Sequence, residues 1–126
     1  TAITRCGDNL TRIGEALRVH RAEHGGAVPD ADRSRLLDTL VEERLGDPTL
    51  RECPLDGQSY ETWREVRIDG PLAPGVEACI PIAWERTWSH APGRRVMFLD
   101  GRHGSMDDAD LDDRLAEVAR AQGFLR

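Results

Sequence analysis

The sequence predicts an α+β domain in which an N-terminal helix packs on one antiparallel sheet. Apolar residues recur at alternating steps of three and four residues near both ends of the chain, which is typical of amphipathic helices. Between them lie short segments of two-residue alternation, separated by glycine and proline, which are typical of strands. The chain has 126 residues, which suits a single domain with a modest core.

The first helix is expected to span Ala2 to Glu23. It should end at Gly25 and Gly26, because glycine readily adopts the left-handed conformation of a helix C-cap. Its apolar stripe consists of Ile3, Cys6, Leu10, Ile13 and Leu17. The helix starts at the second residue without an initiator methionine, which predicts a processed or truncated product of a longer protein.

A second helix is expected over residues 30–45. Asp30 or Asp32 would cap its start, and Gly46 and Pro48 would end it. Its apolar face is formed by Leu36, Leu37, Leu40 and Val41. Consecutive helices joined by a short link commonly lie antiparallel, so this helix should return toward the start of the first.

Residues 58–106 are expected to form the antiparallel sheet, with a loop over residues 70–75. Pro81 places the second strand, which runs to Trp84, at a sheet edge or at a bulge, because proline has no N–H to donate. The residues that define the first two strands are Tyr60, Thr62, Val66 and Ile68 on one face with Trp63 on the other, and then Ile80, Ile82 and Trp84.

The third strand is Arg95 to Leu99. Its unbroken apolar run from Val96 predicts that both faces of the strand are covered. Asp100-Gly101 is a strong hairpin turn signal, and His103 to Met106 can return as the partner strand.

A C-terminal helix is expected over residues 108–123, with Leu111, Leu115 and Val118 on one face. Acidic residues between Asp107 and Asp113 occupy its first turns, where negative charge suits the helix dipole. Calcium is the alternative reading of these carboxylates, but the glycine and terminal glutamate of an EF-hand loop are missing. We therefore expect a capped helix start and no resident cofactor.

The charge balance limits the classes of partner. A formal net charge of −6 argues against binding to nucleic acid or to an anionic membrane surface, because both need a basic stripe. No apolar run approaches the roughly 20 residues of a membrane span, so the chain is expected to be soluble.

Three cysteines leave one unpaired whatever disulfide forms. Their spacing matches no zinc-binding pattern, because no two lie close enough in the sequence to act as a ligand pair. One disulfide with one free thiol fits a domain outside the cytoplasm, and three reduced, buried cysteines fit a cytosolic one. Composition leaves both open.

Few residues suggest catalysis. His90, Asp100 and His103 are the candidates for a two-histidine, one-carboxylate metal site, although histidines on a loop and a turn are more often surface residues. Ser89 and His90 are adjacent, which does not produce the geometry of a Ser–His dyad. Nucleophile-elbow and phosphate-binding glycine motifs are absent from the sequence. We expect no enzymatic activity; the alternative is a small periplasmic metal-binding module or metal-dependent enzyme that uses these three residues.

Four stretches follow one another in an order that resembles a known family. They are Cys6 to Leu17 with the Gly-Gly-Ala-Val-Pro segment after it, Arg51 to Asp56 around Cys-Pro, Ala83 to Glu85, and Arg95 to His103 preceded by His90. Together they resemble the soluble part of type IV pilin-like proteins, in particular the bacterial group related to the major pseudopilin of type II secretion.

The resemblance implies a pilin fold over residues 1–126, in which residues 1–24 are the C-terminal half of a long helix. The first half of that helix would be inserted in the inner membrane or the filament core. The protein would then be a structural subunit of a pilus or secretion pseudopilus, on the periplasmic side of the inner membrane or in an extracellular filament. Its assembly helix would carry Ile3, Leu10, Ile13 and Leu17.

The resemblance also implies partners. These are copies of the chain, other pilin-like subunits and, for a full-length form, a prepilin peptidase and an inner-membrane assembly platform; membrane contact would involve only the missing N-terminal segment. In such a fold the second helix brings Cys53 near the level of Cys6. A Cys6–Cys53 disulfide with Cys79 free is therefore expected, and Cys53–Cys79 is the next pairing.

Overall fold

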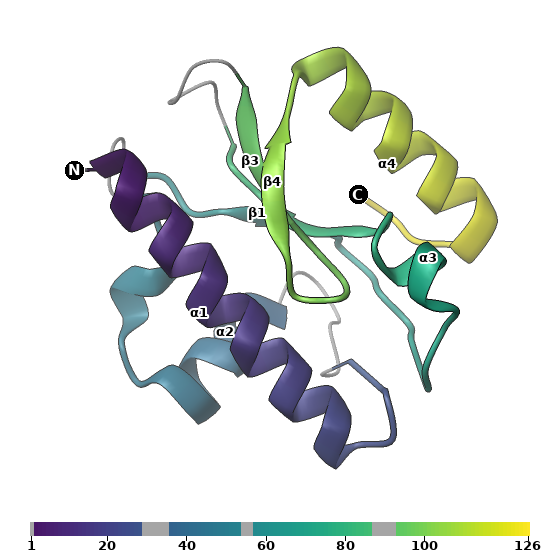
Figure 1. Ribbon diagram of the computed structural model, residues 1–126, viewed down its shortest axis with the longest axis horizontal. Helices are drawn as coiled ribbons and strands as arrows, with labels where there is room; N and C mark the ends of the chain where they lie inside the picture. Colours follow the sequence, from purple (N-terminus) through teal and green to yellow (C-terminus); the bar gives the residue numbers. More distant parts are fainter. Residues whose placement is uncertain (1, 29–35, 54–56, 87–92) are drawn as a thin grey trace.

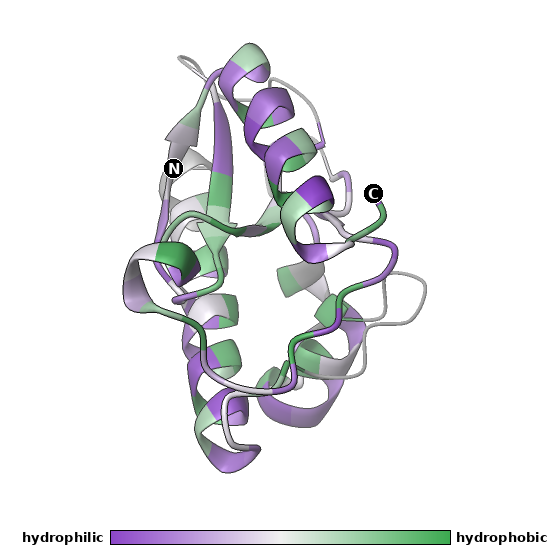
Figure 2. Ribbon diagram, turned by 90° about the vertical axis from the view of Figure 1, so that its right-hand side faces the viewer, coloured by the Kyte–Doolittle hydropathy of each residue, from purple (hydrophilic) through white to green (hydrophobic). Residues whose placement is uncertain are grey.

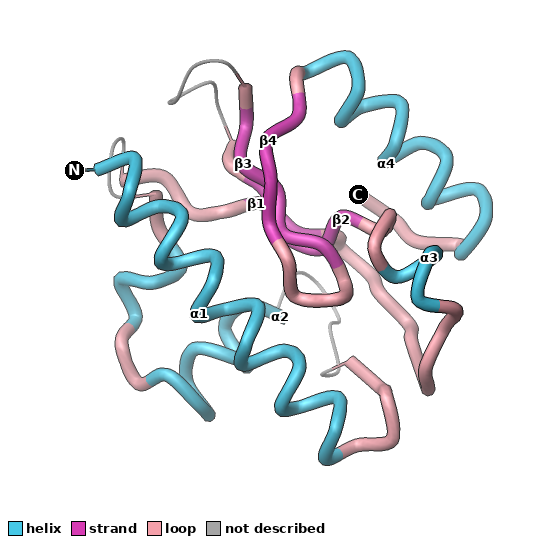
Figure 3. Tube along the Cα trace, viewed as in Figure 1, coloured by secondary structure: helices cyan, strands magenta, loops and turns pink. Residues whose placement is uncertain are grey.

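The computed structural model of the chain describes residues 2–28, 36–53, 57–86 and 93–126. It has the predicted α+β class, with a four-stranded antiparallel sheet between helices (Figures 1 and 3). The long N-terminal helix α1 and the short helix α2 lie on one side of the sheet, and the C-terminal helix α4 lies on the other (Figure 1).

Helix α1 spans Ala2–Glu23, as predicted. Gly25 and Gly26 follow it with φ angles of 65° and 92°, and the Gly26 amide donates to the Arg21 carbonyl, which closes the helix end. Leu10, Ile13 and Leu17 have no exposed surface. In Figure 2, the ribbons of α1 and α4 carry both hydrophilic and hydrophobic residues, as amphipathic helices do.

The second helix is irregular. Helix α2 spans Leu36–Leu40 and continues as a π-helical turn, η2, over Val41–Leu45, which ends at Gly46 with φ 69°. A 3-10 turn, η3, follows over Pro48–Arg51. The expected capping residues Asp30 and Asp32 lie outside the described ranges.

The segment after η2 returns along α1, whereas the second helix itself was predicted to do so; that helix ends beside the C-terminal end of α1. Near the C-terminal end of α1, Arg44 forms an ion pair with Glu23 at 2.6 Å. Nearer the N-terminal end of α1, the Asn9 side-chain amide donates to the Glu52 carbonyl at 3.3 Å. The chain therefore reaches the first turns of α1 just before Cys53.

The sheet has the order β1-β2-β3-β4, and neighbouring strands are antiparallel. Its strands are β1 Glu61–Thr62, β2 Pro81–Trp84, β3 Arg94–Phe98 and β4 His103–Met106. Pro81 lies in an inner strand, and the register between β2 and β3 shifts between Pro81 and Ala83. Of the two predicted positions for Pro81, the bulge is therefore confirmed.

Strand β1 is much shorter than the sequence predicted. At its end, two side chains bond backbone carbonyls of β2 that the amides of a longer β1 would otherwise bond. Thr62 Oγ1 donates to the Ile82 carbonyl, and the Trp63 indole donates to the Pro81 carbonyl at 2.6 Å. The backbone amide of Arg64 then donates to the carbonyl of Leu125 instead. The strand ends because side chains, and not backbone amides, donate to these carbonyls of β2.

Residues 70–75 are not entirely a loop, which corrects the prediction. Pro74 begins a helical turn, α3, over Pro74–Glu77, since the fixed φ of proline suits the first position of a helix. Glu77 in this turn accepts two hydrogen bonds from Arg21 of α1, at 2.9 and 2.8 Å. The turn thereby connects the end of α1 to the segment that enters β2.

Helix α4 spans Asp108–Gln122 and begins as predicted. The Asp107 carboxylate accepts the Asp110 amide, and Gly123 ends the helix with φ 73°. Leu111, Leu115 and Val118 are buried.

Both faces of β3 are covered, as the apolar run predicted. Val96 and Met97 point to opposite faces of the sheet, and neither has exposed surface. Trp63, which follows β1, packs edge-on against Trp84 of β2 and against Phe124. Among the described residues, no helix combines the length and apolarity of a membrane span.

Candidate functional site

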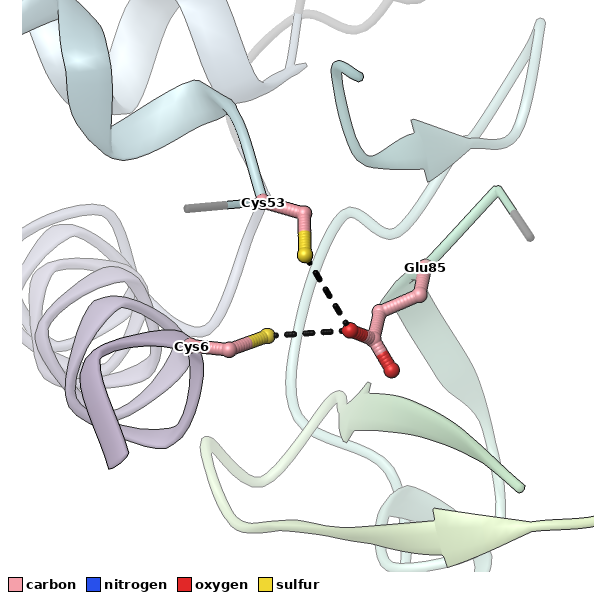
Figure 4. Close-up of side chains that lie close together, drawn as sticks. All are labelled: Cys6, Cys53 and Glu85. Carbon is pink, nitrogen blue, oxygen red and sulfur yellow. Dashed lines mark hydrogen bonds between the residues drawn. The ribbon is translucent and has the colours of Figure 1, made fainter. Parts of the chain in front are cut away.

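Two thiols and a carboxylate converge in the interior of the domain (Figure 4). Cys6 comes from α1, Cys53 follows η3, and Glu85 follows β2. Their exposed fractions are 0%, 2% and 1%. The Sγ atoms of Cys6 and Cys53 lie 3.1 and 3.4 Å from Glu85 Oε2 and donate to it. The three donor atoms all lie within 4.8 Å of one another.

The sheet holds the Glu85 carboxylate in this orientation. Glu85 Oε1 accepts the backbone N–H of Arg95 at 2.6 Å, while the Glu85 amide donates to the Arg95 carbonyl at 3.0 Å. The pair of bonds to one residue of β3 leaves Oε2 directed toward the two sulfur atoms.

Tyr60 is the fourth polar side chain of the cluster. Its hydroxyl lies 3.2 Å from Cys6 Sγ, and its side chain is buried. Burial raises the pKa of Tyr60 and the pKa of Cys6 well above their ordinary values. The Glu85 carboxylate raises the pKa of Cys6 further, while the hydrogen bond with Tyr60 opposes this. Cys6 is therefore a neutral thiol at pH 7.

A surface hollow of about 530 Å³ lies beside the cluster, with Cys53 among its lining residues. Its wall carries three acidic residues, Asp8, Asp47 and Glu52, against one basic residue, Arg12. The remaining lining residues are Asn9, Thr49, Leu50 and Gly57. The wall of the hollow beside the cluster therefore carries more negative than positive charge.

The expected Cys6–Cys53 disulfide is not formed in this structure, where all three cysteines are thiols. The fold does bring Cys6 and Cys53 together, but both side chains donate to Glu85. Cys79 is exposed and belongs to a different region, beside the end of α3, so the alternative Cys53–Cys79 pairing is absent as well.

The alternative two-histidine, one-carboxylate site is not assembled by its described members. Asp100 accepts the backbone amide and the guanidinium of Arg102, as a turn residue does. His103 Nε2 shares a hydrogen bond of 2.9 Å with Thr11, and burial lowers the pKa of His103. His90 and Ser89 lie outside the described ranges.

The acidic stretch from Asp107 to Asp113 serves the start of α4. Asp107 caps the helix, and Asp108 forms an ion pair with Arg94 at 2.8 Å. In the part of the chain that the structure describes, Cys6, Cys53 and Glu85 are the group whose donor atoms converge as metal ligands do, and no such group occurs in this stretch.

The apolar stripe of α1 is used within the domain. Leu10, Ile13 and Leu17 are completely buried, so they attach the helix to the sheet and are not available to a neighbouring molecule. In the proposed assembly helix, these three side chains therefore hold the helix to its own domain. The side chain of Ile3 lies outside what the structure describes.

Glu85 is the site residue that sequence reasoning did not single out for chemistry. The signal that could have identified Glu85 is its position, since this ionisable residue directly follows the fully buried strand β2. Its partners lie 79 and 32 positions away in the sequence, so spacing alone could not identify the cluster.

Comparisons with protein-family models, with characterised proteins and with solved structures find no match to this chain.

Proposed function

We propose that this domain is the globular part of a pilin-like subunit that assembles into a filament, as a structural protein and not as an enzyme. The observation that carries the proposal is the packing of one helix of 22 residues along an antiparallel sheet whose strands follow in sequence order. The segment between helix and sheet folds back beside the helix.

The N-terminal end of α1 supports the proposal, because it lies at the edge of the molecule (Figure 1). An apolar segment joined there would continue the helix outward without crossing the domain. In the proposed subunit, that segment would anchor the protein in the inner membrane and pack in the filament core. The globular domain would face the periplasm or the filament surface.

The outer face of α1 carries charges of both signs. Arg12, Glu15 and Arg18 are exposed there, close together on the helix. Copies of one chain that contact each other through two different surfaces form an open filament when the rotation between copies does not close a ring, and mixed charges suit such contacts. The proposed partners are therefore further copies of this chain and related subunits.

Electron microscopy of filaments sheared from cells that make the full-length protein, labelled with an antibody to this domain, tests the proposal. We expect labelled filaments, and a lower yield from Glu15→Arg on the outer face of α1. Arg120→Glu, an exposed charge reversal near the end of α4, is the matched control. A sheared fraction without this protein, when the cells contain it in quantity, would contradict the proposed function.

A further inference from the structure

We propose that Cys6, Cys53 and Glu85 form a binding site for one zinc ion, which joins α1 to the sheet. This inference goes beyond the proposed filament function and does not depend on it.

The donor atoms have the chemistry and the spacing that zinc needs. Zinc binds thiolate sulfur at about 2.3 Å and carboxylate oxygen at about 2.0–2.2 Å, with tetrahedral geometry. Ligand atoms around such an ion are roughly 3.5–3.8 Å apart. Glu85 Oε2 lies 3.1 and 3.4 Å from the two sulfur atoms, and all three donors are within 4.8 Å of one another. Small side-chain adjustments therefore create the coordination sphere, and a water molecule takes the fourth position.

The surroundings orient the carboxylate as the supporting residues of metal sites do. The Arg95 amide occupies Glu85 Oε1 at 2.6 Å and leaves Oε2 facing the sulfur atoms. Such hydrogen bonds to metal ligands fix their direction and raise affinity. The Tyr60 hydroxyl, 3.2 Å from Cys6 Sγ, is placed to donate to the thiolate of the metal-bound state.

Binding is an exchange of protons for the metal ion. The two thiols are donors to Glu85 in this structure, so zinc would replace their protons, which leave to solvent. No electron transfer is involved. Because a proton is released from each thiol, affinity should rise with pH.

The hollow beside Cys53 supplies a route for the ion. Asp8, Asp47 and Glu52 line it together with Arg12, so the approach carries more negative than positive charge. Such a field raises the local concentration of a divalent cation. Two sulfur ligands favour zinc over magnesium or calcium, which prefer oxygen.

Zinc titration of the reduced 126-residue chain, followed by metal analysis after gel filtration, tests the proposal. We expect one equivalent of bound zinc, a rise in the thermal unfolding midpoint with zinc, and a sulfur-to-cobalt charge-transfer band when Co²⁺ replaces Zn²⁺. Cys6→Ser and Cys53→Ser should lose the bound equivalent and the band. Cys79→Ser is the matched control, because Cys79 is exposed and outside the cluster.

Two further variants, which nearly preserve the size of the side chain, test the proposal where a serine variant does not fold. Tyr60→Phe retains every ligand and should weaken zinc binding about 10–100-fold, as expected for a partner that hydrogen-bonds a ligand. Glu85→Gln removes the carboxylate ligand and should weaken zinc binding further. Absence of both the bound zinc and the cobalt band in the reduced wild-type chain would overturn the proposal. Loss of binding in Cys79→Ser, or its retention in Cys6→Ser and Cys53→Ser, would overturn it as well.

Discussion

Gly14 is predicted to be the position where α1 tolerates no side chain. A Cβ atom at Gly14 would lie 2.2 Å from the Gly101 carbonyl oxygen and 3.1 Å from the Gly101 Cα atom, in the β3–β4 turn. Carbon–oxygen contacts between packed elements are normally roughly 3.3 Å or longer, so Gly14→Ala must separate helix and turn by about 1 Å. The obstructing atoms are backbone and cannot rotate away.

The magnitude follows from two opposing terms. Alanine favours a helix over glycine by about 1 kcal/mol. Overpacking of this kind costs about 1–3 kcal/mol, and we expect the upper end because backbone opposes backbone. The net loss in the free energy of unfolding is therefore about 2 kcal/mol, or about 8 °C in the unfolding midpoint for a domain of this size.

Gly7→Ala on the same helix is the matched comparison. A Cβ at Gly7 would meet the nearest atom, His103 Cε1, at 3.6 Å, an ordinary contact. The same chemical change should therefore stabilise the domain by up to about 1 kcal/mol. Urea unfolding of both variants, followed by the fluorescence of the buried tryptophans, measures the difference. If Gly14→Ala proves as stable as Gly7→Ala, the contact between α1 and the β3–β4 turn is refuted.

Two further predictions concern thiols and pH. In the native, metal-free, reduced protein, Cys79 should react rapidly with a thiol reagent, and Cys6 and Cys53 should react far more slowly, because they are buried; equally rapid reaction of all three would contradict the packing. Glu77→Gln should cost about 3 kcal/mol at pH 7, since it leaves the largely buried Arg21 without its ion-pair partner. The hydrogen bonds from Arg21 lower the pKa of Glu77 below 4.5, so this stabilisation is present above pH 4.5 and is lost as the pH falls through the folded-state value. Equal acid unfolding curves for both proteins would show that the pair contributes nothing.

Local signals in the sequence were sufficient for the two long helices, α1 and α4. The bounds of α1 and the start of α4 follow from periodicity, from the glycines after Glu23 and from the capping aspartate Asp107, all of which act within a few residues. The hairpin between β3 and β4 follows in the same way from Asp100-Gly101, since turn chemistry is local.

Strand β1 and the cysteine pairing depended on contacts distant in sequence. The pattern from Tyr60 to Ile68 predicted a long strand, but Thr62 and Trp63 occupy the neighbouring carbonyls with their side chains and end the ladder. Whether they do so depends on where β2 lies, which no pattern within the segment records. For the same reason, the sequence could not show that Cys6 and Cys53 would donate to a carboxylate.

The sequence by itself determined the fold class, the bounds of α1 and α4 and the β3–β4 hairpin, because periodicity, capping and turn formation operate over a few neighbouring residues. The tertiary structure decided which chemistry-bearing side chains meet. Cys6, Cys53 and Glu85 come from three elements, and their donor atoms converge only when α1 packs on the sheet and the segment after η3 closes beside them. The candidate site therefore arises from packing between distant segments, which local sequence patterns do not encode.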